Sequence, residues 1–221
     1  VEVGAHMGMA YDGDADRLIA VDEKGNIVDG DKIMVISAID MKAKGKLKKD
    51  TLVVTVMSNI GLRIAAEENG INLATTQVGD RYVLEEMIKS DYSLGGEQSG
   101  HLVFLDYNTT GDGTMSSLVL ASIVKAKGEA LSDVASIMDQ YPQVLVNVRV
   151  QNEYKNSYME IKEIADRIED IEKEMDGKGR VLIRPSGTEP LVRVMLEGKN
   201  EDHIYGLAKG LADLIDEKIG L

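Results

Sequence analysis

Apolar and polar positions alternate in short blocks through residues 1–140. The β-branched run TLVVTV at 51–56 has the continuous apolar character of a buried strand. The stretch from Gly30 to Leu47 instead carries Ile33 and Ile36 at the spacing of a helix face, with lysines near its end. By the same criteria, strands are expected at 7–11, 17–22 and 71–78 and on both sides of a glycine-rich turn in 91–105, and helices at 58–70, 79–90, 109–128 and 131–140. Strands that alternate with helices predict an α/β sandwich domain with a mixed, largely parallel sheet.

The predicted ends of these elements depend on turn and capping residues. Segment 22–31 is expected to be a polar turn between a strand and a helix. Ser58 or Asn59 is expected to cap the next helix, which Gly70 ends. For Asp80, a simple N-terminal helix cap is the better explanation when that residue is considered alone.

The pattern changes near Pro142, after which valines occupy every second position from Val144 to Val150. A helix rich in Glu and Ile follows at 159–175, then two strands around a loop within 179–198, and a final amphipathic helix at 201–220. These elements predict a C-terminal α+β domain with an antiparallel sheet. The boundary between the two domains is expected near residues 140–143.

Composition narrows the possible partners. The 221 residues carry 38 acidic and 25 basic side chains, a formal net charge of −13. A nucleic-acid or acidic-membrane partner needs a dominant basic face and is therefore not expected. An anionic small molecule is still a possible ligand if several basic side chains lie close together at one site. The chain has no cysteine, which excludes disulfides and thiol catalysis and suits the cytoplasm. No run reaches the ~18–20 apolar residues of a membrane span.

The segment YDGDADRLIAVD places Asp12, Asp14 and Asp16 at alternate positions, followed by Arg17. In an extended loop such side chains point the same way, so three carboxylates can converge. A hard divalent cation such as Mg²⁺ or Ca²⁺ prefers oxygen ligands and cancels their repulsion. The alternative is a solvated acidic turn without a metal.

An EF-hand is a second interpretation of the same loop. Counted from Asp12, acidic residues stand at positions 3, 5 and 12 of the motif, as Asp14, Asp16 and Glu23. Position 6 requires glycine for a sharp turn, but Arg17 stands there. The flanking segments are also predicted strands, whereas an EF-hand needs helices. A calcium-binding acidic module is therefore the weaker hypothesis.

The loop RPSGTEP at 184–190 has the composition of an anion site. The N–H groups of Ser186, Gly187 and Thr188 can point into one concavity, and the two hydroxyls add further donors. Arg184 adds a forked positive charge, with Arg193 just beyond. A plain hairpin turn is the alternative.

Two further loops are weaker candidates. In GGEQSGH, Glu97, Ser99 and His101 offer groups that suit sugar hydroxyls, although an ordinary β-turn explains the residues equally well. Asp80 and Arg81 open a helix at VGDRYV. TTGDG at 109–113 is expected to be a turn and helix start, more structural than chemical.

Taken in order, these loops resemble those of the α-D-phosphohexomutase superfamily. Its members carry a DGD-x-DR loop that binds Mg²⁺, a GE-x-SGH loop that holds the sugar, and an R-x-SGTEP-type loop that holds a phosphate. Here these loops are Asp12–Arg17, Gly96–His101 and Arg184–Pro190. The likeness covers essentially the whole chain. Within the superfamily, the sequences of these loops are most similar to those of the bacterial phosphoglucosamine mutases. Phosphomannomutase/phosphoglucomutase members are the alternative.

The resemblance implies a role for each site residue. One Mg²⁺ would be held by Asp12, Asp14 and Asp16, and Arg17 would lie beside the transferred phosphoryl group. Sugar hydroxyls would be held by Glu97 and Ser99, while His101 and Arg81 are candidates for proton handling or phosphate contact. A catalytic role is thus implied for Arg17 and His101. The substrate would be a phosphosugar, bound by Asp80, Arg81, Glu97, Ser99, His101, Arg184, Ser186, Gly187, Thr188 and Arg193.

The resemblance also implies that this chain is the C-terminal half of a longer enzyme. The family has four domains, and by analogy residues 1–24 end domain two, 25–140 form domain three and 141–221 form domain four. The SASHNP-type loop with the phosphoserine does not occur in this sequence. The family reaction, glucosamine 6-phosphate to glucosamine 1-phosphate in cell-wall precursor synthesis, is therefore not expected of this chain alone. A homodimer is left open.

Overall fold

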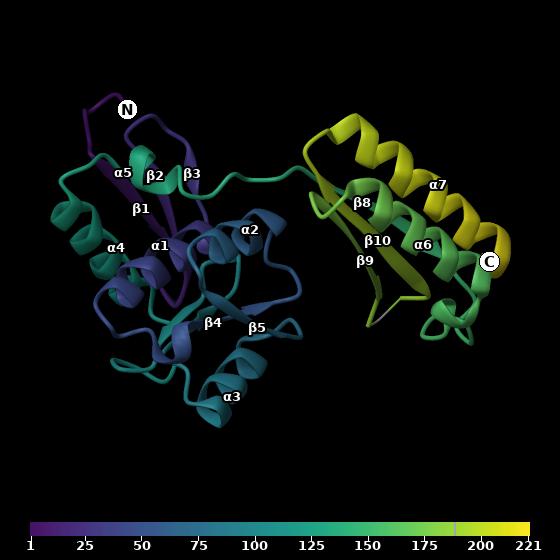
Figure 1. Ribbon diagram of the computed structural model, residues 1–221, viewed down its shortest axis with the longest axis horizontal. Helices are drawn as coiled ribbons and strands as arrows, with labels where there is room; N and C mark the ends of the chain where they lie inside the picture. Colours follow the sequence, from purple (N-terminus) through teal and green to yellow (C-terminus); the bar gives the residue numbers. More distant parts are fainter. Residues whose placement is uncertain (188) are drawn as a thin grey trace. The chain divides into compact units, whose positions relative to one another are not determined.

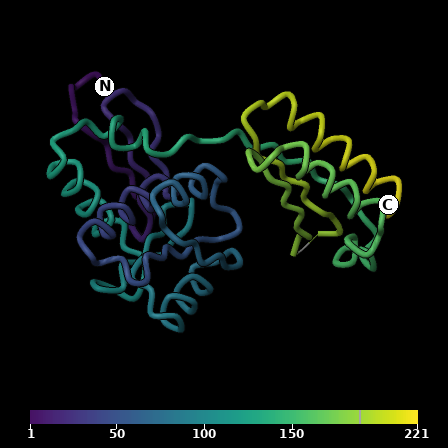
Figure 2. The backbone as a smooth tube through the Cα atoms, viewed as in Figure 1, coloured from purple at the N-terminus to yellow at the C-terminus, as the bar shows by residue number. Residues whose placement is uncertain are grey.

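The computed structural model describes residues 1–187 and 189–221, which divide into two compact units, Val1–Gln140 and Tyr141–Leu221 (Figures 1 and 2). None of the helices in these residues combines the length and apolar character that a bilayer crossing needs. Each unit has its own hydrophobic core. The site-bearing loops lie at the ends of the strands that these cores fix.

The first unit begins with an antiparallel meander of β1 (Met7–Tyr11), β2 (Leu18–Asp22) and β3 (Ile27–Val28). The predicted polar turn is confirmed at its centre, residues 24–26, but the strand β3 in the second half of 22–31 was not expected. The carboxylate of Asp22 accepts the N–H groups of Lys24 and Asn26, at 2.9 and 2.8 Å, and so closes a tight hairpin. Val28 then pairs with Ala20 and is 1% exposed.

The main sheet of this unit has the strand order β5–β4–β6–β7. Its strands are β4 (Thr51–Thr55), β5 (Asn72–Thr76), β6 (Leu94–Gly96) and β7 (Leu102–Phe104). The pairs β4–β5 and β4–β6 are parallel and β6–β7 is antiparallel, which confirms the predicted mixed, largely parallel sheet.

Helices cover both faces of this sheet, which explains why every residue of β4 is buried. Leu52 and Val54 belong to the large core on one face, whereas Val53 packs with Val83 and Met87 of α3 on the other. The helices are α1 (Gly30–Ala43), α2 (Ile60–Glu68), α3 (Asp80–Ser90), α4 (Gly113–Lys127) and the short α5 (Leu131–Ala135), and a 3-10 turn, η1, spans Lys48–Asp50. The predicted α/β sandwich is confirmed.

The helix starts test the capping predictions. Asn59 caps α2, because its Oδ1 accepts the N–H of Gly61 at 2.9 Å. Asp80 is not a cap: it is the first residue of α3, and Gly79, at φ +133°, occupies the cap position without a side-chain bond. Asp80 Oδ1 accepts the N–H of Arg81 instead. The cap expectation for Asp80 was therefore wrong, because the helix already includes Asp80 and Gly79 occupies the cap position.

The second unit is a three-stranded antiparallel sheet in the order β8–β10–β9, as predicted for an α+β domain. Its elements are β8 (Gln143–Arg149), η2 (Tyr158–Glu160), α6 (Lys162–Met175), β9 (Gly179–Pro185), β10 (Leu191–Gly198) and α7 (Glu201–Ile219). Helices α6 and α7 pack on the face that carries Val192, Val194 and Leu196 (Figure 1). The alternate residues, including Arg193, point to the other face.

Helix α4 provides a matched pair for the packing of the first core. Leu120 is fully buried, whereas Leu118 on the same helix is 63% exposed. We predict that Leu120→Ala lowers the free energy of unfolding of this unit by about 2–5 kcal/mol through lost transfer energy and a residual cavity. Leu118→Ala should stay within about 0.5 kcal/mol. Urea unfolding followed by circular dichroism measures both, and equal losses would contradict the assigned core face.

Candidate active site

The three aspartates lie in the turn between β1 and β2. One carboxylate oxygen from each of Asp12, Asp14 and Asp16 lies within 4.8 Å of the others. The turn is closed by the Ala15 N–H, which donates to Asp12 O at 3.2 Å, with Ala15 in the left-handed region at φ +59°. The carboxylates therefore converge through a tight turn, and not through an extended loop. The flanking elements are strands, which excludes an EF-hand here.

This carboxylate cluster fits a divalent cation on one further observation. Oδ1 of Asp16 is buried and has no hydrogen-bond partner among the described residues. An ionised oxygen in that position is costly unless a cation or donor meets it. Oxygen-only donors at this spacing suit Mg²⁺ or Ca²⁺.

Arg17 folds back over the start of the same loop. Its N–H donates to Asp12 Oδ1 at 3.2 Å, and its Nε lies 3.7 Å from Asp12 Oδ2. Desolvation acts to raise the pKa of Asp12, but the Arg17 N–H, the Asp16 side chain and the Arg17 charge together hold that pKa below its usual value. The guanidinium itself is about half exposed, so it can also face a ligand.

Main-chain pairing joins this loop to the glycine-rich turn between β6 and β7. The Leu18 N–H donates to Gly100 O at 3.1 Å, and Arg17 and His101 form an antiparallel bridge. Gly100 has φ +95°, and a Cβ there would lie 2.2 Å from Leu18 O. Only glycine lets the two backbones approach this closely.

A third loop, Thr109–Gly113, completes this framework. The Gly111 N–H donates to His101 Nε2 at 3.1 Å, and the Gly113 N–H donates to Ala15 O at 2.9 Å. Asp112 caps α4 by accepting the Met115 N–H, which confirms the predicted helix start. The loop thus contacts both the acidic turn and the buried His101 ring.

The remaining predicted sugar-binding residues lie around Glu97. Its Oε1 accepts the Gly79 N–H at 2.9 Å, which ties the β6–β7 turn to the turn before α3. That contact brings the exposed residues Asp80 and Arg81 to the neighbourhood of Glu97. Arg81 pairs with Glu85 at 2.7 Å on the helix surface, and Ser99 is exposed in the glycine-rich turn.

In the second unit, the predicted phosphate loop follows β9. Ser186 is 4% exposed, its N–H donates to Leu191 O at 2.9 Å, and its Oγ accepts the Glu189 N–H at 3.3 Å. Gly187 is exposed, and Thr188 lies outside the described residues. The serine therefore shapes the loop with its own backbone.

Arginines gather on the open face of this sheet. Arg184 and Arg193 are direct cross-strand partners, so their side chains share one face. Burial, and then the charge of Arg193, lower the pKa of Arg184. The sheet register places Arg149 on the same face, opposite Leu191. Among the described residues, none of these three arginines forms an ion pair, although the chain carries 38 acidic side chains.

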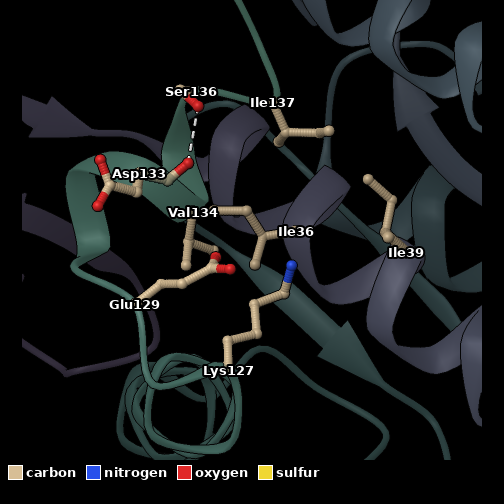
Figure 3. Close-up of a pocket in the computed structure, with 8 residues that line it drawn as sticks. All are labelled: Ile36, Ile39, Lys127, Glu129, Asp133, Val134, Ser136 and Ile137. Carbon is tan, nitrogen blue, oxygen red and sulfur yellow. Dashed lines mark hydrogen bonds between the residues drawn. The ribbon is translucent and has the colours of Figure 1, made fainter.

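A separate hollow of ≈190 Å³ lies in the first unit between α1 and α5 (Figure 3). Ile36, Ile39, Val134 and Ile137 are four of the eight residues that line it, and the Ser136 hydroxyl donates a hydrogen bond to the Asp133 carbonyl. It contains none of the predicted site residues. Lys127, Glu129, Asp133 and Ser136 also line it, but it lies apart from the loops that carry the predicted site residues and is not taken as the candidate site.

Family models match both units. The model described as phosphoglucomutase/phosphomannomutase alpha/beta/alpha domain III covers residues 29–141, and the model of the C-terminal domain covers 145–214. The chain belongs to the phosphoglucomutase/phosphomannomutase family. Residues 1–28 precede both matches and hold the acidic turn.

Relatives and solved structures agree with this membership. The chain is 68% identical to phosphoglucosamine mutase of Clostridioides difficile (strain 630) and 64% identical to that of Thermoanaerobacter sp. (strain X514), in each case over 99% of this chain and 49% of the relative. It therefore spans about half the length of these curated relatives. A crystal structure of Aspergillus fumigatus N-acetylphosphoglucosamine mutase with GlcNAc-6P and magnesium matches with TM-score 0.75 at 22% identity, over 94% of this chain and 48% of that one. A product complex of N-acetylglucosamine-phosphate mutase matches with TM-score 0.74.

Sequence reasoning missed two features of this family member's site. The Gly111 N–H was not expected to contact His101, because a main-chain donor leaves no signal in residue type. Arg149 was not considered, because only the β8–β10 register places it on the strand next to the one that carries Arg193. The strict valine alternation in β8 could have suggested that Arg149 points away from the core.

The contact at Gly111 predicts a steric effect. A Cβ on this residue would lie 2.4 Å from His101 Nε2, so Gly111→Ala must displace the ring or the loop. We predict a loss of about 1–3 kcal/mol in the free energy of unfolding of the first unit, as for an overpacked core. Gly206→Ala, in α7 where the new Cβ meets no atom within 4 Å beyond the helix's own backbone and its chain neighbours, should be neutral or stabilising. Thermal unfolding of both variants measures the contrast, and an unchanged Gly111→Ala would contradict the packing of this loop.

Proposed function

We propose that this chain is the C-terminal half of a phosphoglucosamine mutase, which converts glucosamine 6-phosphate to glucosamine 1-phosphate through a phosphoserine and a bisphosphate intermediate. The observation that carries the proposal is the convergence of Asp12, Asp14 and Asp16 in a chain 58–68% identical to phosphoglucosamine mutases. Domain assignments by analogy, with 1–24 ending domain two, 25–140 as domain three and 141–221 as domain four, are part of the proposal. So are a role in cell-wall precursor synthesis and a cytoplasmic location.

The acidic turn is proposed to hold one Mg²⁺ through Asp12, Asp14 and Asp16. When bound, the ion would neutralise charge on the non-bridging oxygens of the transferred phosphoryl group. The half-exposed Arg17 guanidinium, next to this cluster, is suited to contact the same oxygens. A calcium-binding acidic module is not supported, because strands flank the turn.

The sugar is proposed to contact the turn at Glu97 and Ser99. Glu97 uses Oε1 to fix Gly79, and its position beside the exposed Asp80 and Arg81 forms a polar rim from two loops. A carboxylate held by a main-chain donor is pre-oriented to accept hydrogen bonds from hydroxyls. Asp80 and Arg81 are proposed as further contacts, with the phosphosugar as the only partner that the chain's chemistry requires.

The loop after β9 is proposed to bind the phosphate that does not react. Arg184 and Arg193 supply forked donors from one face, and the exposed residue Gly187 follows the strand of Arg184 in the loop. Ser186, Gly187 and Thr188 complete the assignment, with Thr188 proposed from the sequence alone. Arg149 is a further candidate on the same face.

Substrate choice tests the proposal against its alternative, a phosphomannomutase/phosphoglucomutase. The enzyme made of this chain joined to its N-terminal half should show its highest kcat/KM with glucosamine 6-phosphate in coupled assays on the glucosamine, glucose and mannose phosphates. A preference for glucose or mannose phosphate would favour the alternative. The 221-residue chain alone should turn over none of the three sugars. The proposed reaction passes through a phosphoserine in a SASHNP-type loop, and that loop does not occur in this sequence. Turnover by the chain alone would refute this assignment of the serine.

Inorganic phosphate tests the arginine face separately. Binding to the folded state raises the unfolding temperature. Phosphate should therefore raise the unfolding temperature of the second unit above the value measured in chloride at the same ionic strength. Arg184→Gln should abolish most of this shift. Arg167→Gln, an arginine of α6 away from the loop, should keep it. A phosphate shift that survives Arg184→Gln would argue against this loop as the anion site.

A further inference from the structure

The open face of the second unit's sheet carries an excess of positive charge. Among its described strand residues are Arg149 of β8, Arg193 of β10, and Arg180 and Arg184 of β9, because cross-strand partners share a face. The one acidic residue in that set, Glu197, is buried and pairs with Arg180. Three arginines of this face therefore have no acidic partner on it, in a chain whose formal net charge is −13.

Arg149 lies at the end of β8 that is next to the loop after β9. Its direct partner on β10 is Leu191, whose carbonyl accepts the Ser186 N–H at 2.9 Å on the β9 side. The Val150 N–H donates to Pro190 O at 3.0 Å, which fixes this end of β8 to the end of the same loop. Arg149, Leu191 and Ser186 therefore form one row across the three strands.

Arg193 lies between the other two arginines. It follows Leu191 by two residues on the central strand, so it is the diagonal neighbour of Arg149 and the direct partner of Arg184. Diagonal neighbours on one face lie about 7–8 Å apart, within reach of long side chains. Arg149 is exposed, and Arg184 and Arg193 are partly exposed. The three guanidinium groups can therefore meet one ligand above Leu191.

A phosphate monoester matches three guanidinium groups in both charge and shape. It carries close to two negative charges near neutral pH and has three terminal oxygens that accept hydrogen bonds. Each guanidinium presents a planar fork of donors to such oxygens. A phosphodiester carries a single charge and has only two terminal oxygens, so it leaves one fork without an acceptor.

We propose that Arg149 is a third arginine of the anion site, and that with Arg184 and Arg193 it makes this site selective for a phosphate monoester over a phosphodiester. The inference rests on the proposed phosphate loop after β9, to which Arg184 and Arg193 were assigned. Arg149 adds a contact from β8, the strand on the opposite side of Arg193.

Affinities of the 221-residue chain for two small probes test this role. Methyl phosphate is the monoester and dimethyl phosphate the diester, each followed by ¹H–¹⁵N spectra at pH 8 and constant ionic strength. We expect the chain to bind the monoester about 10-fold more tightly than the diester. Arg149→Gln should weaken monoester binding by about 10-fold, as for a lost hydrogen bond between charged groups, and change diester binding little.

Two variants control for charge and for position. Arg149→Lys keeps the charge but loses the fork, so it should recover only part of the monoester affinity. Arg167→Gln, on α6, should bind both probes as the wild type does.

Stability without ligand separates a binding role from a structural one. Arg149→Gln removes a like charge beside Arg193, so the unfolding temperature of the ligand-free chain should be unchanged or higher. A fall in that temperature together with the loss of affinity would indicate a structural arginine and would contradict the proposal.

The outcomes distinguish this inference from the proposed function. If the wild-type chain binds neither probe, or if Arg184→Gln binds methyl phosphate as well as the wild type does, the phosphate loop itself is refuted. If binding depends on Arg184 but Arg149→Gln keeps both the affinity and the preference for the monoester, only the role of Arg149 is refuted. Full recovery in Arg149→Lys also overturns it, because the fork would then not matter.

Discussion

The hydrogen bond from the Leu18 N–H to Gly100 O is the constraint on which the candidate site depends. It joins the acidic turn to the glycine-rich turn, two loops about 80 residues apart in the chain. The Arg17–His101 bridge follows from it, and so does the contact between His101 and Asp16. Because a Cβ at residue 100 would lie 2.2 Å from Leu18 O, this pairing exists only with glycine at that position.

Like charges are concentrated in both units, and in both the backbone holds them together. The tight turn at Ala15 brings three carboxylates together in the first unit, and the β9–β10 register sets Arg184 against Arg193 in the second. Like charges directly opposite each other on a sheet are destabilising, by up to about 1 kcal/mol per pair. If the cation and the phosphate bind as proposed, each removes one of these repulsions, and binding is then coupled to stability at both sites.

Periodicity was sufficient to predict most of the fold. The continuous apolar run of β4 predicted a strand covered on both sides, because parallel sheets are buried on both faces. The two-residue strand β3 could not be predicted from its own hydrophobic pattern. It forms because the Asp22 carboxylate accepts hydrogen bonds from the turn that precedes it. The Asp80 cap failed for a related reason, since the left-handed Gly79 had already taken the cap position.

The sequence predicted the parts of the candidate site in which residues of one chemical type recur at short spacing. The convergence of the aspartates was expected from their spacing, although the turn that achieves it was not. The contact of the Gly111 amide depends on backbone approach, and the place of Arg149 beside the strand of Arg193 depends on strand register, neither of which residue types encode.

This distinction changes how the signature loops should be interpreted. Gly100, Gly111 and Gly113 are required where one backbone or ring passes within van der Waals distance of another. They are therefore constraints of the framework, and a match at these positions reports the architecture of the loops before it reports a substrate. Under the proposed function, contact with a particular sugar would come from side chains that the framework leaves exposed, among them Ser99 and Arg81. A difference in sugar preference between two proteins that share these glycines would accordingly arise at such exposed positions.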